Sequence, residues 1–170
     1  ICSLNEGVER CTITCEMEID SKGDIVNYQI FPSLIKTAHR MTYTKVNQII
    51  AGDEYACEQY EDLVEMVQNM CELSQIIRNK RVNKGAIDFD IKEGKVLVDE
   101  DGKPIDVIVR ERGEAERIIE DFMVQANECV ASHMKWQSLP SIYRIHETPD
   151  AKKMREFVGI ASLFGVKFKG

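Results

Sequence analysis

The sequence has no long hydrophobic run and no visible targeting signal. No apolar stretch approaches the roughly 18 residues that a membrane-spanning helix needs, and no charged segment followed by an apolar one opens the chain. We therefore expect a cytoplasmic protein with no membrane partner. Because the first residue is Ile1 rather than Met, we also expect a piece of a longer protein. A chain of 170 residues, 44% of them hydrophobic, can bury one sizeable core, so we predict a single domain over residues 1–170.

The sequence also lacks the short motifs of the common enzyme classes. It has no glycine-rich phosphate loop and no serine elbow. His39, His133 and His146 lie far apart, and none has a metal-ligand or nucleophile pattern beside it. Cys11 and Cys15 have a spacing that a zinc site could use, but no second Cys or His pair lies nearby. For the six cysteines, free and mostly buried thiols are the preferred interpretation.

Positive charge is in deficit, with 22 Lys and Arg against 29 Asp and Glu and a formal net charge of -7. This balance argues against a surface that coats nucleic acid in general, although it leaves room for a local basic groove. Two acidic stretches invite a metal. Leu97 occupies the place of the first aspartate of a calcium loop, so the DEDGK stretch is interpreted as a turn. Asp88 and Asp90 could hold a divalent cation, but a solvated strand face is preferred.

Extended segments follow from period-two alternation. Cys11 to Ile19 alternates apolar and polar residues, Ser21 to Asp24 forms a turn, and Ile25 to Phe31 returns, which predicts a β-hairpin. A second hairpin is predicted around Asp101 and Gly102. The other predicted extended segments are residues 33–41, 86–91 and 141–147, and the strands of the second hairpin are 95–98 and 104–110.

Four helices are predicted from period-3.6 patterning. The longest spans Gly113 to Trp136, with Glu116, Glu120 and Asn127 in a row at the boundary between its two faces. Its apolar stripe is Ala115, Ile119, Phe122, Met123, Ala126, Val130 and His133, and its polar side carries Arg117, Asp121 and Glu128. The other helices run from an N-cap at Thr42 to Gly52, from about residue 58 to 81, and from a cap at Thr148 and Pro149 to Gly165. The fold class is therefore α+β, with mostly antiparallel strands and hairpins packed with long amphipathic helices.

Five blocks of the sequence resemble, in order and spacing, the catalytic domain of ribonuclease R and ribonuclease II, called the RNB domain. The chain is closer to ribonuclease R because of its RIHE sequence. The resemblance implies a processive 3′ to 5′ exoribonuclease that hydrolyses single-stranded RNA with magnesium and releases nucleoside monophosphates, with no DNA substrate expected. The blocks are CSLN at residues 2–5, AHRMTYTKV at 38–46, GAIDFD at 85–90, ERIIEDFMVQANECVA at 116–131 and YRIHETPD at 143–150.

Two motifs of that family are missing. A cluster of aspartates that holds catalytic magnesium precedes the first block in the family, and an arginine-bearing motif follows the last. We therefore expect an internal fragment of the catalytic domain that has no catalytic residues of its own and is inactive alone. The magnesium (Mg2+) would be bound by residues outside this fragment, because two-metal hydrolysis needs carboxylates to hold the ions.

By resemblance, three residues contact RNA. Tyr43 matches a tyrosine of the RNA channel, Phe89 an aromatic that stacks on a base, and Glu120 a glutamate at the terminal nucleotides. An aromatic ring stacks on any base, and a carboxylate can accept from a ribose 2′-hydroxyl. Pattern alone allows simpler roles: Phe89 in the core, Tyr43 in helix packing and Glu120 at a helix boundary. Arg144 and His146 fit a phosphate contact and a structural network equally well.

The alternative function is a noncatalytic α+β protein-interaction module that shares the fold. An RNA-channel wall predicts Tyr43 and Phe89 near a common cleft. An interaction module predicts both aromatics buried and an exposed apolar patch elsewhere.

Overall fold

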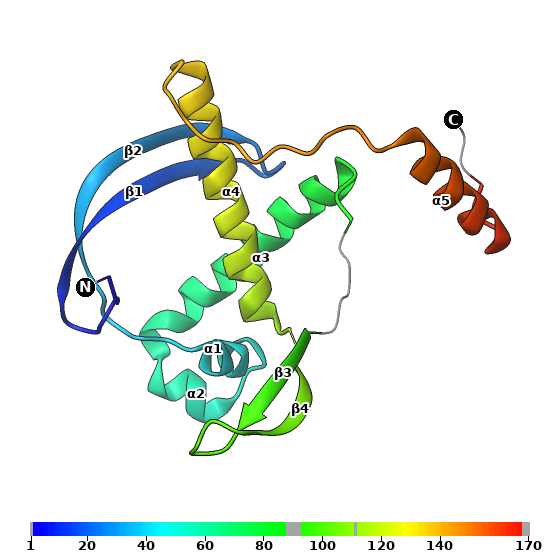
Figure 1. Cartoon of the computed structure of the whole chain (residues 1–170). Coiled ribbons are helices and arrows are strands. Elements are labelled where there is room, and N and C mark those ends of the chain that lie inside the picture. The colour runs from blue at the N-terminus through cyan, green and yellow to red at the C-terminus, as the bar shows by residue number, and fades with distance from the viewer. Residues whose placement is uncertain (1, 88–92, 111, 168–170) are drawn as a thin grey trace.

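The computed structural model describes residues 2–87, 93–110 and 112–167 (Figure 1). Its elements confirm the α+β class, with two antiparallel hairpins and helices of very different lengths. The predicted strand 86–91 lies largely outside the described residues, as do Phe89, Asp88 and Asp90. The elements are β1 (Glu9–Ile19), β2 (Ile25–Lys36), α1 (Tyr43–Ile50), α2 (Glu54–Gln59), α3 (Glu61–Asn83), β3 (Glu93–Val98), β4 (Pro104–Arg110), α4 (Glu114–Trp136) and α5 (Ala151–Leu163).

The first hairpin pairs β1 with β2 and curves past α4 (Figure 1). Its turn is held by Asp20, whose carboxylate accepts hydrogen bonds from the backbone N–H groups of Lys22 and Asp24 at 2.9 and 2.8 Å. β2 continues beyond the predicted end at Phe31 and includes Pro32. Proline is tolerated because half of the N–H groups in a two-stranded sheet point away from the partner strand.

The predicted wet face of β1 is wrong in the first half of the strand. Ile13 is 79% exposed, whereas Thr12 and Thr14 are partly buried. The physical reason is a hydroxyl cluster, in which the Ser33 Oγ of β2 lies 2.7 Å from the Thr12 Oγ1 and 2.6 Å from the Thr14 Oγ1. Hydrogen bonding satisfies these polar groups on the more buried face.

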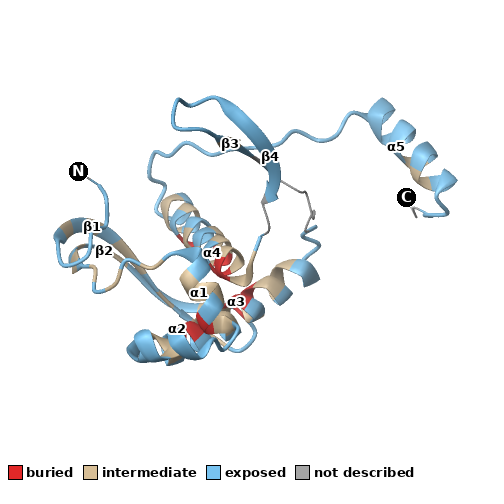
Figure 2. Ribbon diagram, turned by 90° about the horizontal axis from the view of Figure 1, so that it is seen from below, coloured by how far each residue is buried: buried red, intermediate tan, exposed pale blue. Residues whose placement is uncertain are grey.

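The core lies where α1, α2, α3 and α4 meet, which is where the buried residues gather in Figure 2. Thr42 caps α1 as predicted, its Oγ1 accepting from the backbone N–H of Lys45. The helix predicted from about residue 58 to 81 is α3, which begins at Glu61. The short helix α2, which ends at Gln59 and is separated from α3 by Tyr60, is not among the predicted helices. The core cluster consists of Ile49, Ala56, Tyr60 and Val67.

α4 has the predicted length, but its buried face is not the predicted one. Ile119 and Met123, expected inside, are 38% and 60% exposed. Asp121, expected on the polar side, is only 3% exposed. Arginines of α3 neutralise its carboxylate, which allows an acidic side chain to occupy the packed face. The buried residues of α4 are Ala115, Ile118, Asp121, Gln125 and Cys129.

The second hairpin and the segment that follows α4 lie outside the helical core (Figure 1). The Asp99 Oδ1 accepts from the backbone N–H groups of Asp101 and Lys103 and so forms the turn between β3 and β4. The strand predicted over residues 141–147 is wrong, because residues 139–150 form no helix or strand. α5 is capped by Asp150 rather than Thr148 and stands away from the other helices (Figures 1 and 2). Within the described residues, no helix is long and apolar enough to cross a membrane.

Candidate functional site

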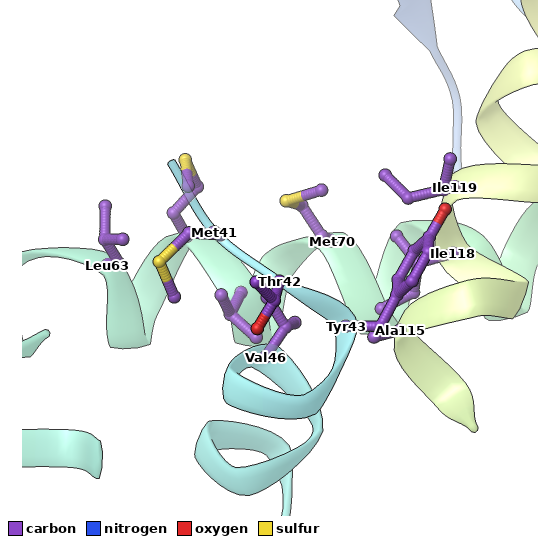
Figure 3. A pocket seen from close by; sticks show the side chains of 11 residues that line it. Met41, Thr42, Tyr43, Val46, Leu63, Met70, Ala115, Ile118 and Ile119 are labelled. Atoms are coloured by element: carbon purple, nitrogen blue, oxygen red, sulfur yellow. The ribbon is translucent and has the colours of Figure 1, made fainter. Parts of the chain in front are cut away.

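Tyr43 lies at the edge of an apolar groove of about 580 Å³ between α1, α3 and α4. Its side chain is 41% exposed, so it is neither a sealed core residue nor a free surface residue. Figure 3 shows its ring alongside Ala115 and Ile118 of α4. Thr42 and Tyr43 carry the only polar side-chain atoms in the lining, which consists of Met41, Thr42, Tyr43, Val46, Leu63, Met66, Val67, Met70, Ala115, Ile118 and Ile119. Such a surface suits a flat or apolar group.

Glu120 lines a different and much smaller cavity, of about 70 Å³. Its carboxylate forms an ion pair with Arg112, and both side chains are partly exposed, at 46% and 40%. The structure therefore does not place Glu120 in the Tyr43 groove, although Ile119, the residue before it, lines that groove. The lining of the small cavity is Arg78, Arg81, Val82, Ala86, Ile87, Arg112, Glu120 and Asp121.

Phe89, the third candidate, lies outside the described residues. Ile87, the last described residue before it, lines the small cavity with Glu120 and is 73% exposed. The prediction that Phe89 contacts RNA therefore stays a prediction.

A buried polar network next to Glu120 joins α3 to α4. The Asp121 carboxylate accepts from the Ser74 hydroxyl at 2.7 Å, from the Arg78 Nε at 3.0 Å and from the Arg81 Nη1 at 2.8 Å. Arg78 also donates to Glu114 at 3.0 Å. Burial alone would lower the pKa of Arg78, but its hydrogen bonds to Glu114 and Asp121 raise the pKa above its ordinary value. The network therefore keeps Arg78 charged and holds α4 at a fixed rotation.

Reasoning from the sequence missed this network. The available signal was the spacing of Ser74, Arg78 and Arg81, which puts all three on one side of α3. A carboxylate on a facing helix is the expected partner of two such arginines, but the sequence alone does not say which helix faces α3.

The remaining candidate groups form no second site among the described residues. The His39 Nε2 lies 3.0 Å from the Asp62 Oδ2, and the His133 Nδ1 lies 3.1 Å from the Tyr28 hydroxyl. The described cysteines are free, but Cys2 and Cys11 are exposed and only Cys129 is fully buried, so the prediction of mostly buried thiols is wrong. Arg144 and His146 are both exposed.

No metal centre forms within the described part of the chain. Nowhere in residues 2–87, 93–110 and 112–167 do three or more His, Cys, Asp or Glu side chains lie close enough together to hold an ion. The carboxylate of Asp99 already accepts backbone hydrogen bonds within its own turn. The described donors therefore do not fit a catalytic magnesium, and no chemical step can be assigned to a metal here.

The two hairpins, the helical core and the half-exposed groove define an α+β fold. The chain belongs to the RNB domain family, whose model matches residues 1–168.

Known ribonucleases are similar to the chain along its whole length. Ribonuclease R 1 of Lactococcus lactis subsp. lactis is 50% identical over 170 residues, which are 100% of this chain and 21% of that protein. Ribonuclease R of Thermotoga maritima is 41% identical over 99% of this chain and 24% of its own length. The chain thus spans about a fifth to a quarter of the length of these relatives.

A solved structure shares the fold. Mycoplasma genitalium ribonuclease R in complex with ribose-methylated single-stranded RNA is 30% identical, with a TM-score of 0.89 over 99% of this chain and 26% of that one. The same protein has also been solved with double-stranded RNA, at the same TM-score. This agreement confirms the fold class that the resemblance implied.

Proposed function

We propose that this chain is part of the catalytic domain of a 3′ to 5′ exoribonuclease of the ribonuclease R type, acting on single-stranded RNA. The observation that carries the proposal is the match along the entire chain, in sequence at 50% identity and in fold at a TM-score of 0.89. Within it, Tyr43, Phe89 and Glu120 contact the RNA strand. The magnesium that activates water is bound by carboxylates outside the described residues.

Tyr43 supplies a stacking surface. Its ring is 41% exposed and stands beside an almost entirely apolar groove, so a base can lie against it without displacing a buried polar group. Stacking of a base on an aromatic side chain contributes about 1–3 kcal/mol and does not depend on base identity. A nuclease that removes every nucleotide in turn needs contacts of this kind.

Glu120 supplies an acceptor for ribose. Its carboxylate is held by Arg112 and its side chain is 46% exposed, so the carboxylate is oriented while the side chain stays reachable from solvent. A carboxylate that accepts from a 2′-hydroxyl distinguishes RNA from DNA, which lacks that group.

Digestion of a 5′-labelled oligoribonucleotide with magnesium tests the proposal. The 170-residue chain is compared with the full-length polypeptide that carries it, and we expect only the latter to shorten the RNA from its 3′ end. In that polypeptide Tyr43→Ala is expected to weaken RNA binding by about 5- to 150-fold, which corresponds to the stacking energy. Tyr55→Ala is the matched control, because Tyr55 is 75% exposed on α2 and is not among the residues that line the groove.

The interaction-module alternative has one observation in its favour. The β3–β4 hairpin exposes apolar side chains on both faces, with Val107 of β4 66% exposed on one face and Ile108 40% exposed on the other. However, that alternative also expects Tyr43 to be fully buried, and it is not. A folded full-length polypeptide that leaves RNA intact would make this alternative the preferred function.

A further inference from the structure

The N-cap residue of α4 is Gly113, which has no side chain that could accept a hydrogen bond. Asn47 of α1 supplies the missing acceptor. The Asn47 Oδ1 accepts from the Ala115 backbone N–H at 2.9 Å, and its Nδ2 donates to the Glu116 Oε2 at 3.1 Å. Glu116 also accepts from the Gly113 backbone N–H at 3.1 Å, and these contacts together form a junction between α1 and α4. One amide thus satisfies two groups of the first turn of α4, as an N-cap residue would.

Gly113 makes room for this contact. A Cβ atom at position 113 would lie 2.4 Å from the Asn47 Nδ2 and 2.8 Å from its Oδ1. The φ of Gly113 is -81°, an angle that any residue can adopt, so the glycine is needed for space rather than for backbone conformation. α1 and α4 are therefore joined by a polar contact that only a residue without a side chain permits.

The junction lies one helical turn from both described site residues. On α1, Asn47 follows Tyr43 by four residues, and on α4, Glu116 precedes Glu120 by four residues. Residues four apart lie on the same side of a helix, one turn from each other. The Asn47–Glu116 contact therefore fixes the separation and relative rotation of the two turns that carry Tyr43 and Glu120.

We propose that Asn47 is a positioning residue for ribose recognition at the RNA 3′ end. It acts by holding the turn of α4 that carries Glu120 in a fixed position relative to the turn of α1 that carries Tyr43, so that Glu120 meets a ribose 2′-hydroxyl while Tyr43 contacts a base of the same strand. The proposal rests on the proposed function. A shift of about 1 Å between positioning groups can cost about 100-fold in rate, so loss of the junction affects recognition even when the fold survives.

The readout is the ratio of degradation rates for an all-ribose oligonucleotide and one with a 2′-deoxyribose at its 3′ end. In the full-length polypeptide, Asn47→Ala is expected to lower this ratio by about tenfold, because Glu120 no longer meets the 2′-hydroxyl. Asp53→Ala is the matched control. Asp53 also caps a helix, its side chain accepting from the Ala56 backbone N–H at 2.9 Å, but that helix is α2 and not α4.

A swap of donor and acceptor separates positioning from folding. Asn47→Asp places a second carboxylate against Glu116 and is expected to lower the ratio as Asn47→Ala does. Adding Glu116→Gln restores a donor on the α4 side, since the new amide nitrogen can donate to the carboxylate introduced on α1 from the position of the Glu116 Oε2. The ratio is then expected to recover.

Three outcomes would overturn the assignment: folded Asn47 variants that keep the wild-type ratio, an Asp53→Ala variant that lowers the ratio equally, or a double variant that does not recover. A wild-type polypeptide that leaves RNA intact would instead overturn the proposed function, and the assignment with it.

Discussion

Asp121→Ala is expected to destabilise the chain far more than removal of the glutamate beside it. The Asp121 side chain is 4% exposed and accepts hydrogen bonds from Ser74, Arg78 and Arg81. Breaking one partner of a buried ion pair costs about 3–5 kcal/mol, because the remaining charge is left buried. Arg78 and Arg81 keep 21% and 30% of their side chains exposed, so water can partly solvate them once Asp121 is gone. We therefore expect a loss of about 3 kcal/mol, at the low end of that range.

The assay is urea unfolding of the 170-residue chain, followed by circular dichroism. Glu120→Ala is the matched control, because it removes a carboxylate from the preceding residue but breaks a pair that is 40–46% exposed. Such surface pairs contribute up to about 1 kcal/mol. For a domain of this size, about 3 kcal/mol lowers Tm by about 6–12 °C. Equal losses for the two variants would refute the conclusion that the Asp121 network joins α3 to α4.

Three further results are expected. Burial raises the pKa of Cys129 to about 11. At about pH 8 Cys129 should therefore react with iodoacetamide much more slowly than the exposed Cys2, as followed by mass spectrometry. Equal rates for the two thiols would contradict the burial of Cys129. The hydrogen bond and charge of Lys80 lower the pKa of Asp24 below 3.8. The Asp24–Lys80 pair should therefore stabilise the β1–β2 turn above that pH, and this stabilisation should be lost as the pH falls through the lowered pKa. If the stability of Lys80→Ala depends on pH as that of the wild type does, this is refuted. Asp150→Ala should remove about 1 kcal/mol from α5 and lower helicity by circular dichroism, and unchanged helicity would exclude Asp150 as the cap.

Local sequence signals predicted the elements well where their causes are local. The α1 N-cap at Thr42 and both hairpins with their turns follow from side chains within a few residues of each other, and the structure confirms them. The cap of α5 failed by two residues, because Thr148 and Asp150 both suit an N-cap and only the backbone decides between them.

The predictions that failed depend on residues far apart in the sequence. Hydrophobic periodicity placed Asp121 outside because nothing near it in the sequence shows the arginines of α3 that neutralise it. Asn47 escaped notice for the same reason, since its partners lie 68 and 69 positions later. The candidate contacts themselves, Tyr43 and Glu120, came from family resemblance and remain predictions.

The two polar contacts of α4 have a common consequence for the site. Apolar packing is non-directional, so it brings α4 against its neighbours without fixing its rotation. The site needs a fixed rotation, because the consecutive residues Ile119 and Glu120 line different cavities. Asn47 holds the first turn of α4 from α1, and the Asp121 network holds the second turn from α3. With two neighbouring turns tied to two different helices, α4 cannot rotate without breaking a hydrogen bond, and the polar groups therefore determine which side chain faces the Tyr43 groove.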